Sequence, residues 1–214
     1  MTHTFAVAVV DTHTHEKSLH AVKSTLECFS KIPLHVSRLY WISDAPFTSQ
    51  VTVKVCHHVV PKITNFPQDY NQLILRLLPQ IVTEDFLFII QYDGFAVNHQ
   101  AWCLEFLDYD YVGAVWPSWE SVGTNTVGNG GFSLRSKKLL RSLQHVDFDM
   151  NVNEDELICR GHRAQLEQQH GIKFSPAYLA HRFSIEQVMN NAWLGKSLGF
   201  HGKHGIADWY GVQI

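Results

Sequence analysis

The chain has 214 residues, a formal net charge of −3 at pH 7, 45% hydrophobic residues and 17% charged residues. This length suits one folded domain with a substantial core, and the composition is that of a globular protein. A negative net charge without a run of lysine or arginine argues against binding to nucleic acid or to an anionic membrane surface.

The cysteines and the N-terminal segment bear on location. Four cysteines are dispersed without a C-x-x-C pair, a usage that predicts reduced thiols and a cytoplasmic protein. The apolar run Phe5–Val10 is too short for a membrane span and lacks the basic segment of a signal peptide. We therefore expect no membrane span and no targeting segment.

Apolar β-rich runs and segments of helical period alternate over the first 95 residues. Strands are expected at 5–10, 37–42, 51–59 and 86–90, and helices at 18–31 and 68–82. This alternation predicts an α/β fold, with a mixed, mostly parallel sheet flanked by helices. Ligands of such sheets bind beyond the carboxyl ends of the strands. The polar residues expected at this rim are Asp11, Thr12, Asp44 and Asp93.

The second half of the chain is less regular. Residues 102–111 predict a short aromatic helix or turn, 111–117 a further strand, and 127–143 a loop, a short strand and a helix. Ser184 is expected to open another helix, with Glu186 in its first turn. Because no repeat or linker separates the halves, we expect a single domain over residues 1–214, with two lobes.

A first chemical pattern, Asp-Thr-His-Thr-His, follows the first predicted strand at residues 11–15. In an extended segment His13 and His15 point to the same side, as in metal-dependent hydrolases. Such enzymes usually need further histidine and carboxylate ligands, and the strand that leads to Asp93 offers no histidine. A metal-dependent hydrolase is one alternative, polar residues that merely open a loop are the second, and a loop that contacts a nucleotide is the third.

A second pattern is Phe-Ile-Ile-Gln-Tyr-Asp-Gly-Phe at residues 88–95. Asp-Gly after a strand most often marks a turn, because glycine accepts positive φ and aspartate bonds its own backbone. A carboxylate at a strand end can equally hold Mg²⁺ or Mn²⁺, which bridge a diphosphate to the protein. Asp93 is therefore either a turn residue or a metal ligand.

Two later stretches complete the candidate chemistry. The glycines of the first are Gly128, Gly130 and Gly131, which allow a backbone to approach a sugar or phosphate closely, although a glycine-rich turn would explain them as well. The second is the acidic triplet Glu154–Glu156 at a predicted helix start, where it favours the helix dipole. One of these carboxylates can also be a general base that deprotonates an acceptor hydroxyl.

Several motifs, taken together and in order, resemble an uncharacterised family of microbial domains related to GT-A glycosyltransferases. The likeness covers residues 65–205. The stretches that carry it are FIIQYDGF, FLDYDYVGAVWP, VGNGGFSLRSKKLL, EDELICR, LEQQHGIKFSPAYLAHRFSIE and LGFHG. The resemblance implies a Rossmann-like GT-A domain, with a nucleotide-binding lobe at 1–95 and an acceptor-binding, catalytic lobe at 96–214.

The activity that the resemblance implies is transfer of a hexose from a nucleotide sugar, a UDP-hexose, to a hydroxyl group of a glycan or another acceptor, as in polysaccharide biosynthesis. It also implies a divalent metal, Mn²⁺ or Mg²⁺, on the diphosphate. Asp93 matches the last acid of the family's Asp-x-Asp motif, and His201 matches a C-terminal histidine ligand, with His204 as second choice. Gln91 replaces the first acid, which leaves open whether a metal is required.

Roles for further residues follow from the same resemblance. Asp155 would be the general base of an inverting reaction, with Glu154 as its substitute. The residues expected to contact the nucleotide sugar are Thr12, His13, Asp44, Asn71, Gln91, Asp93, Gly130 and Gly131. The aromatic residues that could stack on sugar rings are Trp116, Trp119 and Phe132. A non-catalytic nucleotide-sugar or glycan-binding module is the remaining alternative, and Gln91 is its best support.

Overall fold

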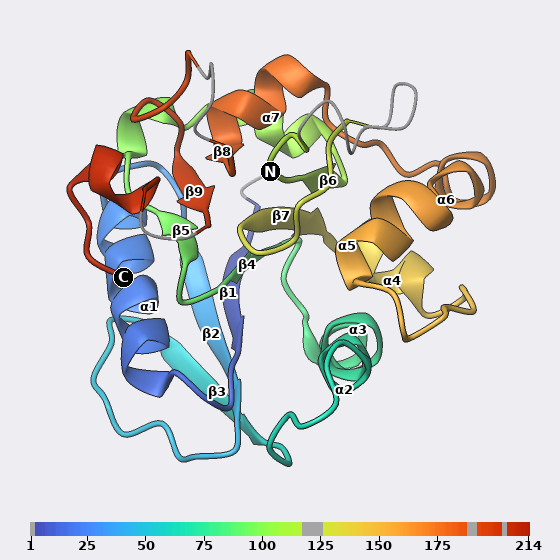
Figure 1. The fold of residues 1–214 in the computed structure, drawn as a ribbon, viewed down its shortest axis with the longest axis horizontal. Coiled ribbons are helices and arrows are strands. Elements are labelled where there is room, and N and C mark those ends of the chain that lie inside the picture. Colours follow the sequence, from blue (N-terminus) through green and yellow to red (C-terminus); the bar gives the residue numbers. More distant parts are fainter. Residues whose placement is uncertain (1–2, 117–125, 188–191, 203–204) are drawn as a thin grey trace.

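The computed structural model describes residues 3–116, 126–187, 192–202 and 205–214 (Figure 1). Its strands are β1 (Phe5–Val10), β2 (Val36–Ser43), β3 (Lys54–Val59), β4 (Phe86–Ile90), β5 (Gly94–Ala96), β6 (Tyr111–Val112), β7 (Ser133–Ser136), β8 (Ser184–Ile185) and β9 (Gly199–His201). Its α-helices are α1 (His15–Ser30), α2 (Gln68–Gln72), α3 (Leu78–Ile81), α4 (Lys137–Leu143), α5 (Glu154–Glu156), α6 (Arg163–His170) and α7 (Ala177–Phe183). π-helical turns at Leu73–Leu77 and Leu157–Gly161 extend α2 and α5.

The central sheet has the strand order β3-β2-β1-β4-β7-β6. Strands β3, β2, β1 and β4 all run parallel to one another. Strand β7 runs antiparallel to β4, and β6 runs antiparallel to β7. This arrangement confirms the predicted mixed, mostly parallel sheet. Because residues 1–95 supply four of these strands and residues 96–214 the other two, both halves of the chain share one sheet.

Apolar side chains cover both faces of this sheet, since successive residues of a strand point to opposite sides. Val7 and Phe88 pack with α1 on one face, and Ala8 and Ile89 pack with α3 and α4 on the other. Figure 1 shows α1 and these two helices on opposite sides of the strands. Burial of each large apolar side chain stabilises the folded state by about 1.5–3 kcal/mol. Every residue of β1 and β4 is buried, so these two strands hold the edge of the sheet at their carboxyl ends firmly in place.

A second, smaller sheet has the order β5-β9-β8. Strands β5 and β9 pair antiparallel, with Gly94 opposite His201, and β8 pairs parallel with β9. Strand β5 directly follows Asp93 in the sequence, whereas β8 and β9 come near the end of the chain. The pairing therefore brings a histidine from the end of the chain to the residues that follow β4.

The predicted helix start at Ser184 is wrong. Helix α7 ends at Phe183, and Ser184–Ile185 form the strand β8 instead. The ring of Phe183 is buried against Phe88 and Phe132, and the backbone after it hydrogen-bonds as a strand with β9. Tertiary pairing thus outweighs the local capping signal. The strand predicted at 111–117 is likewise shorter, since β6 contains only Tyr111–Val112.

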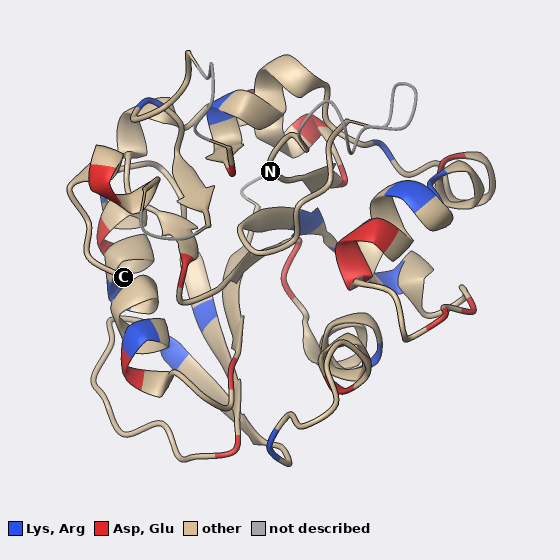
Figure 2. Cartoon of the chain, viewed as in Figure 1, with Lys and Arg blue, Asp and Glu red and all other residues tan. Residues whose placement is uncertain are grey.

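Helices and cysteines complete the description. Within the described residues, no helix combines the length and the apolar character needed to cross a bilayer. Cys28, Cys56, Cys103 and Cys159 are free thiols. In Figure 2, basic and acidic residues are interspersed over the elements, and α5 stands out as an acidic helix.

Candidate active site

Two neighbouring cavities lie beyond the carboxyl ends of β1 and β4. The first, of about 300 Å³, we call the acidic cavity; its lining residues are Phe66, Tyr70, Asn71, Gln91, Trp116, Asn129, Gly131, Asn153, Glu154, Asp155, Glu156, Glu186 and His201. The second, of about 510 Å³, we call the N-terminal cavity; its lining residues are Val10, Asp11, Thr12, His13, Thr14, Ser18, Ile63, Thr64, Phe66, Tyr70, Gln91 and Tyr92. Phe66, Tyr70 and Gln91 line both, so the two cavities adjoin.

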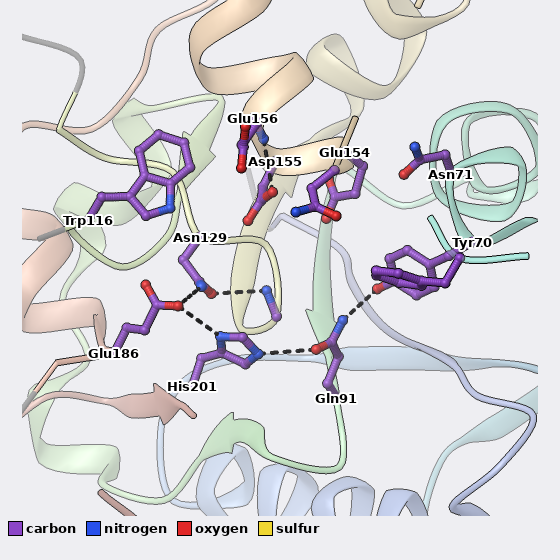
Figure 3. Close-up of a pocket in the computed structure, with 13 residues that line it drawn as sticks. Tyr70, Asn71, Gln91, Trp116, Asn129, Glu154, Asp155, Glu156, Glu186 and His201 are labelled. Atoms are coloured by element: carbon purple, nitrogen blue, oxygen red, sulfur yellow. Dashed lines mark hydrogen bonds and ion pairs between the residues drawn. The ribbon is translucent and has the colours of Figure 1, made fainter. Parts of the chain in front are cut away.

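Segments far apart in the sequence build the acidic cavity (Figure 3). Tyr70 lies in helix α2, and Gln91 is the residue that follows β4. Helix α5 supplies the acidic triplet, and β9 supplies His201. The fold thus brings the predicted base, Asp155, and the predicted metal ligand His201 to one cavity. Asp93, the other predicted metal ligand, is absent from the described lining of both cavities.

His201 lies among three oxygen atoms. Its Nε2 atom is 3.1 Å from Oε1 of Gln91 and 3.8 Å from Oδ1 of Asp93. Its Nδ1 atom is 3.7 Å from Oε1 of Glu186. Burial alone would lower the pKa of His201, but the contact with Glu186 and the charge of Asp93 raise it above its usual value. The neighbouring carboxylates thus favour the protonated form of the imidazole.

The Asp93 and His201 pair fits the divalent metal that the resemblance implies. Oδ1 of Asp93 is buried and has no hydrogen-bond partner among the described residues, and it lies beside the His201 imidazole. The described part of the chain contains no group of three or more potential His, Cys, Asp or Glu ligands. Mg²⁺ and Mn²⁺ often take few protein ligands and complete their shell with phosphate and water. A metal on this pair would therefore depend on a bound diphosphate.

Gln91 connects the two cavities through its amide. Its Nε2 atom donates to the hydroxyl of Tyr70 at 2.8 Å, and its Oε1 atom faces His201. Both ends of the amide are thus engaged with protein (Figure 3). Because an amide is neutral, Gln91 adds no second negative charge beside Asp93. A metal would also have to compete with Oε1 of Gln91 for the Nε2 atom of His201.

Glycines make room for two side chains of the site, those of His201 and Glu154. A Cβ atom at Gly131 would lie 2.2 Å from Nε2 of His201, and one at Gly94 would lie 2.7 Å from Cδ2 of the same ring. A Cβ atom at Gly130 would lie 2.1 Å from Oε1 of Glu154. Gly131 lines the acidic cavity, whereas Gly130 is not among the described residues that line it. Gly94 is thus required for close approach of the imidazole, and not for positive φ as a turn residue.

Replacement of Gly131 by alanine is expected to displace His201, because a Cβ atom would overlap the imidazole. A misplacement of about 1 Å can lower an enzymatic rate by roughly 10²-fold. Activity measurements on Gly131→Ala and on the control Gly161→Ala test this, because the nearest atom to a Cβ at Gly161 is 3.8 Å away. Wild-type activity in Gly131→Ala would show that the position of His201 is unimportant.

The acidic triplet separates into two environments. Glu154 is 4% exposed, and its Oε1 atom accepts a hydrogen bond of 2.9 Å from Nη2 of the fully buried Arg135. Burial raises the pKa of Glu154, although the Arg135 guanidinium acts in the opposite direction. Asp155 lines the cavity, with Oδ2 accepting from the Gly130 amide and Oδ1 from the Glu156 amide, at 3.1 and 2.9 Å. Of the two predicted bases, Asp155 is the better placed, because two backbone donors orient its carboxylate.

The predicted nucleotide contacts divide between the cavities. Thr12 and His13 line the N-terminal cavity, but the Thr12 hydroxyl is already engaged, accepting from the Ile63 amide at 3.0 Å. Asp44 is paired with His15 at 2.9 Å and is absent from the described lining of either cavity. Asn71, expected to reach the same pocket as Thr12, lines the acidic cavity instead.

The Asp-Thr-His-Thr-His segment is organised as a helix start, which does not favour the hydrolase alternative. The Asp11 carboxylate accepts from the amides of His13 and Thr14 and from the hydroxyls of Thr14 and Ser18. The His13 imidazole bonds the carbonyl of Thr12, and His15 pairs with an aspartate after β2. The two imidazoles therefore have different partners, and the carboxylate is used in holding the turn that leads into α1.

Asp11 should stabilise the fold in a pH-dependent way. Burial alone would raise the pKa of Asp11, but hydrogen bonds from Ser18, His13 and Thr14 lower it below 3.8. Since the folded state favours the carboxylate, this stabilisation is present above about pH 4 and is lost as the pH falls through the folded pKa. Asp11→Asn is expected to lower the free energy of unfolding by about 1–2 kcal/mol at pH 7, because hydrogen bonds to a charged acceptor contribute more than bonds to a neutral one.

Urea denaturation at pH 7 and pH 2.5 measures this effect, and the gap between Asp11→Asn and wild type should shrink in acid. Glu16→Gln is the matched control, because it removes an exposed carboxylate from the first turn of the same helix. A gap that persists unchanged in acid would contradict the assigned role of the Asp11 carboxylate.

The aromatic candidates do not share one environment. Trp116 lines the acidic cavity but is only 5% exposed, with the Arg160 guanidinium 3.8 Å from its ring centre. Phe132 is wrong as a sugar-stacking residue, because it is fully buried and stacks on Phe183 in the core. Trp119 and His204 lie outside the described residues.

Sequence reasoning missed five side chains of the acidic cavity as ligand-contacting candidates: Phe66, Tyr70, Asn129, Asn153 and Glu186. Asn129 stands within the glycine-rich stretch and could have been found there, since its Oδ1 atom accepts from the Gly131 amide at 3.1 Å. Tyr70 precedes Asn71 in the same helix. Glu186 carries no local signal, because its position depends on the pairing of β8 with β9.

Comparisons with known proteins agree with this architecture. No curated protein matches the chain. Among solved structures, it is similar to "Crystal structure of a glycosyltransferase involved in the glycosylation of the major capsid of PBCV-1", with a TM-score of 0.60, 9% identity and 97% of each chain covered. At this identity the likeness shows the fold alone, which is glycosyltransferase-like. A family model described as "Protein of unknown function (DUF5672)" matches residues 56–201. The chain therefore belongs to the DUF5672 family.

Proposed function

We propose that this protein is a glycosyltransferase that moves a hexose from a nucleotide sugar, UDP-linked, to a hydroxyl group of a glycan or another acceptor, with inversion. The observation that carries the proposal is the convergence of Asp155, Gln91 and His201 on one cavity. That cavity adjoins a second one beyond the carboxyl ends of parallel strands, where such sheets bind nucleotides. The fold likeness to a glycosyltransferase supports the same reaction class.

The reaction needs a base for the acceptor and positive charge for the leaving group. The acceptor oxygen forms a bond to the anomeric carbon while the bond from that carbon to the diphosphate oxygen breaks. Asp155 takes the proton of the acceptor hydroxyl, and the nucleoside diphosphate leaves with the bonding electron pair. Attack on the face opposite the leaving group inverts the anomeric configuration.

Stabilisation of the leaving diphosphate falls to the residues around His201. Asp93 and His201 would hold a Mn²⁺ or Mg²⁺ ion, which when bound offsets the negative charge of the diphosphate. Gln91 lies at the junction of the two cavities, so its amide can orient the diphosphate or the sugar between them. The nucleoside would occupy the N-terminal cavity, against Tyr92 and the exposed ring of Phe66.

A thermal-shift screen tests this function. UDP-glucose, UDP-galactose and GDP-mannose, each with and without Mn²⁺, should raise the melting temperature if bound, since a ligand at a hundred times its Kd stabilises by about 2.7 kcal/mol. Asp93→Asn should remove the part of the shift that needs Mn²⁺. Asp108→Asn is the control, because Asp108 is exposed and outside the described lining of both cavities. The proposal is overturned if no nucleotide or nucleotide sugar shifts the melting temperature.

One observation favours a second candidate, a non-catalytic nucleotide-sugar or glycan-binding module. Gln91 stands where the resemblance leads us to expect an acid, and both ends of its amide are engaged with protein. Such a module would bind the nucleotide sugar without transferring it. Release of free nucleotide from a bound nucleotide sugar, measured with and without a mixture of glycan acceptors, distinguishes the two functions.

A further inference from the structure

Three buried oxygen atoms that belong to lining residues of the acidic cavity have no hydrogen-bond donor among the residues that the structure describes. One, Oε2 of Glu186, belongs to the side chain beside His201. The other two are Oδ1 of Asn71 and Oε2 of Glu154. Asn71 is fully buried and Glu154 is 4% exposed, and both side chains line the cavity. Buried acceptors are nearly always satisfied in native proteins, so these two point to a ligand that brings donors.

The protein fixes both oxygen atoms in place. Nδ2 of Asn71 donates to the carbonyls of Met150 and Val152, each at 2.8 Å. Since a carbonyl can only accept, these bonds settle which end of the amide is oxygen. The other oxygen of Glu154, Oε1, accepts from Nη2 of Arg135 at 2.9 Å. These bonds therefore hold the acceptor oxygen of each side chain in one direction, whichever ligand binds.

The charge of the cavity restricts the ligand further. Its carboxylates are Glu154, Asp155, Glu156 and Glu186. Among its described lining residues there is no lysine or arginine, and the one residue that can be cationic is His201. The diphosphate belongs at the His201 end, while α5 and α2 form the part with Asn71 and Glu154 (Figure 3). A carboxylate on the ligand would be repelled there, because like charges a few ångströms apart repel each other more strongly near protein than in bulk water.

We propose that Asn71 and Glu154 select an uncharged, hydroxyl-rich hexose as the transferred sugar. Two hydroxyl groups of the pyranose donate to Oδ1 of Asn71 and Oε2 of Glu154, and hexuronates are excluded. This inference rests on the proposed function and adds the sugar class to it. A site that binds hydroxyl groups through buried acceptors discriminates strongly against ligands without matching donors.

Isothermal titration of the wild-type chain tests the selection directly. The ligands are UDP, GDP, UDP-glucose, UDP-galactose, GDP-mannose and the matching hexuronates, UDP-glucuronate, UDP-galacturonate and GDP-mannuronate. At least one hexose donor should bind more tightly than its hexuronate by about tenfold or more. Equal or tighter binding of every hexuronate overturns the inference while leaving nucleotide binding intact. Failure of every nucleotide to bind overturns the proposed function instead.

A variant tests the role of Asn71 separately from its part in the fold. Asn71→Leu keeps a similar size but removes the acceptor, and should weaken binding of the preferred hexose donor by roughly tenfold. The affinity for the nucleoside diphosphate alone should not change. An equal loss for both ligands would show that Asn71 only supports the fold. Asn153→Leu, at an exposed position on the same cavity, is the control. If Asn71→Leu does not fold, the wild-type comparison still decides.

Discussion

Replacement of Asp155 by asparagine is expected to lower the rate of sugar transfer by roughly 10²–10⁴-fold, the usual contribution of general base catalysis. The variant should fold, because asparagine keeps the size of the side chain and an oxygen for the hydrogen bond from the Gly130 amide, and loses only the acceptor for the Glu156 amide. It cannot take the proton of an acceptor hydroxyl. The fall should therefore appear in kcat, with little change in the affinity for the nucleotide.

Steady-state kinetics and nucleotide titration of the same preparations measure this effect. Glu156→Gln is the matched control, because Glu156 lines the same cavity from the same helix. If Asp155→Asn is folded and fully active, Asp155 is not the base. A large loss in Glu156→Gln but not in Asp155→Asn would assign that role to Glu156.

Replacement of Arg135 by methionine is expected to destabilise the protein by about 3–5 kcal/mol, because it leaves the buried carboxylate of Glu154 without its partner. Arg135 is fully buried in β7, where its Nη2 atom is 2.9 Å from Oε1 of Glu154. Its Nε atom donates to the Ser133 hydroxyl at 3.1 Å, and its guanidinium lies 5.3 Å from the ring centre of Tyr111. The ion pair joins α5 to the central sheet, and so positions Asp155.

Urea denaturation gives the change in free energy of unfolding. The double variant Arg135→Met, Glu154→Gln should recover part of the loss, since it removes both buried charges. Glu27→Ala, which breaks an exposed pair with Lys31, serves as the surface control and should have little effect. A loss in Arg135→Met of less than about 1 kcal/mol, the size expected for a surface pair, would contradict the assigned role.

Several elements of the fold were predictable because local patterns specify them. The apolar run of β1, with every residue buried, reads as a strand covered on both faces. The helical period of residues 68–82 appears as α2, a π-helical turn and α3 over Gln68–Ile81. Ser184 shows the limit of such reasoning. Its capping signal was overruled by pairing with β9, a strand that begins at Gly199.

Candidate site residues were predictable in type but less so in placement. The position of Asp93 after a buried strand and the order of the later motifs indicated the region of the site. Nothing local distinguished Asp155 from Glu154, because the difference depends on Arg135 in a strand 19 residues away. The location of Asn71 in the acidic cavity likewise depends on backbone carbonyls about 80 residues later in the chain.

The sequence by itself determined the alternation of strands and helices, the edge of the sheet where polar residues collect, and the acidic and glycine-rich character of the site. These properties arise from periodicity and residue type, which act over a few neighbouring positions. Only the tertiary structure decided that Gly94 and Gly131 make room for His201, and that Glu154 is tied to Arg135 while Asp155 faces the cavity. The reason is that strand register and buried pairing between distant segments set these contacts, and neither can be read from residues that are close in sequence.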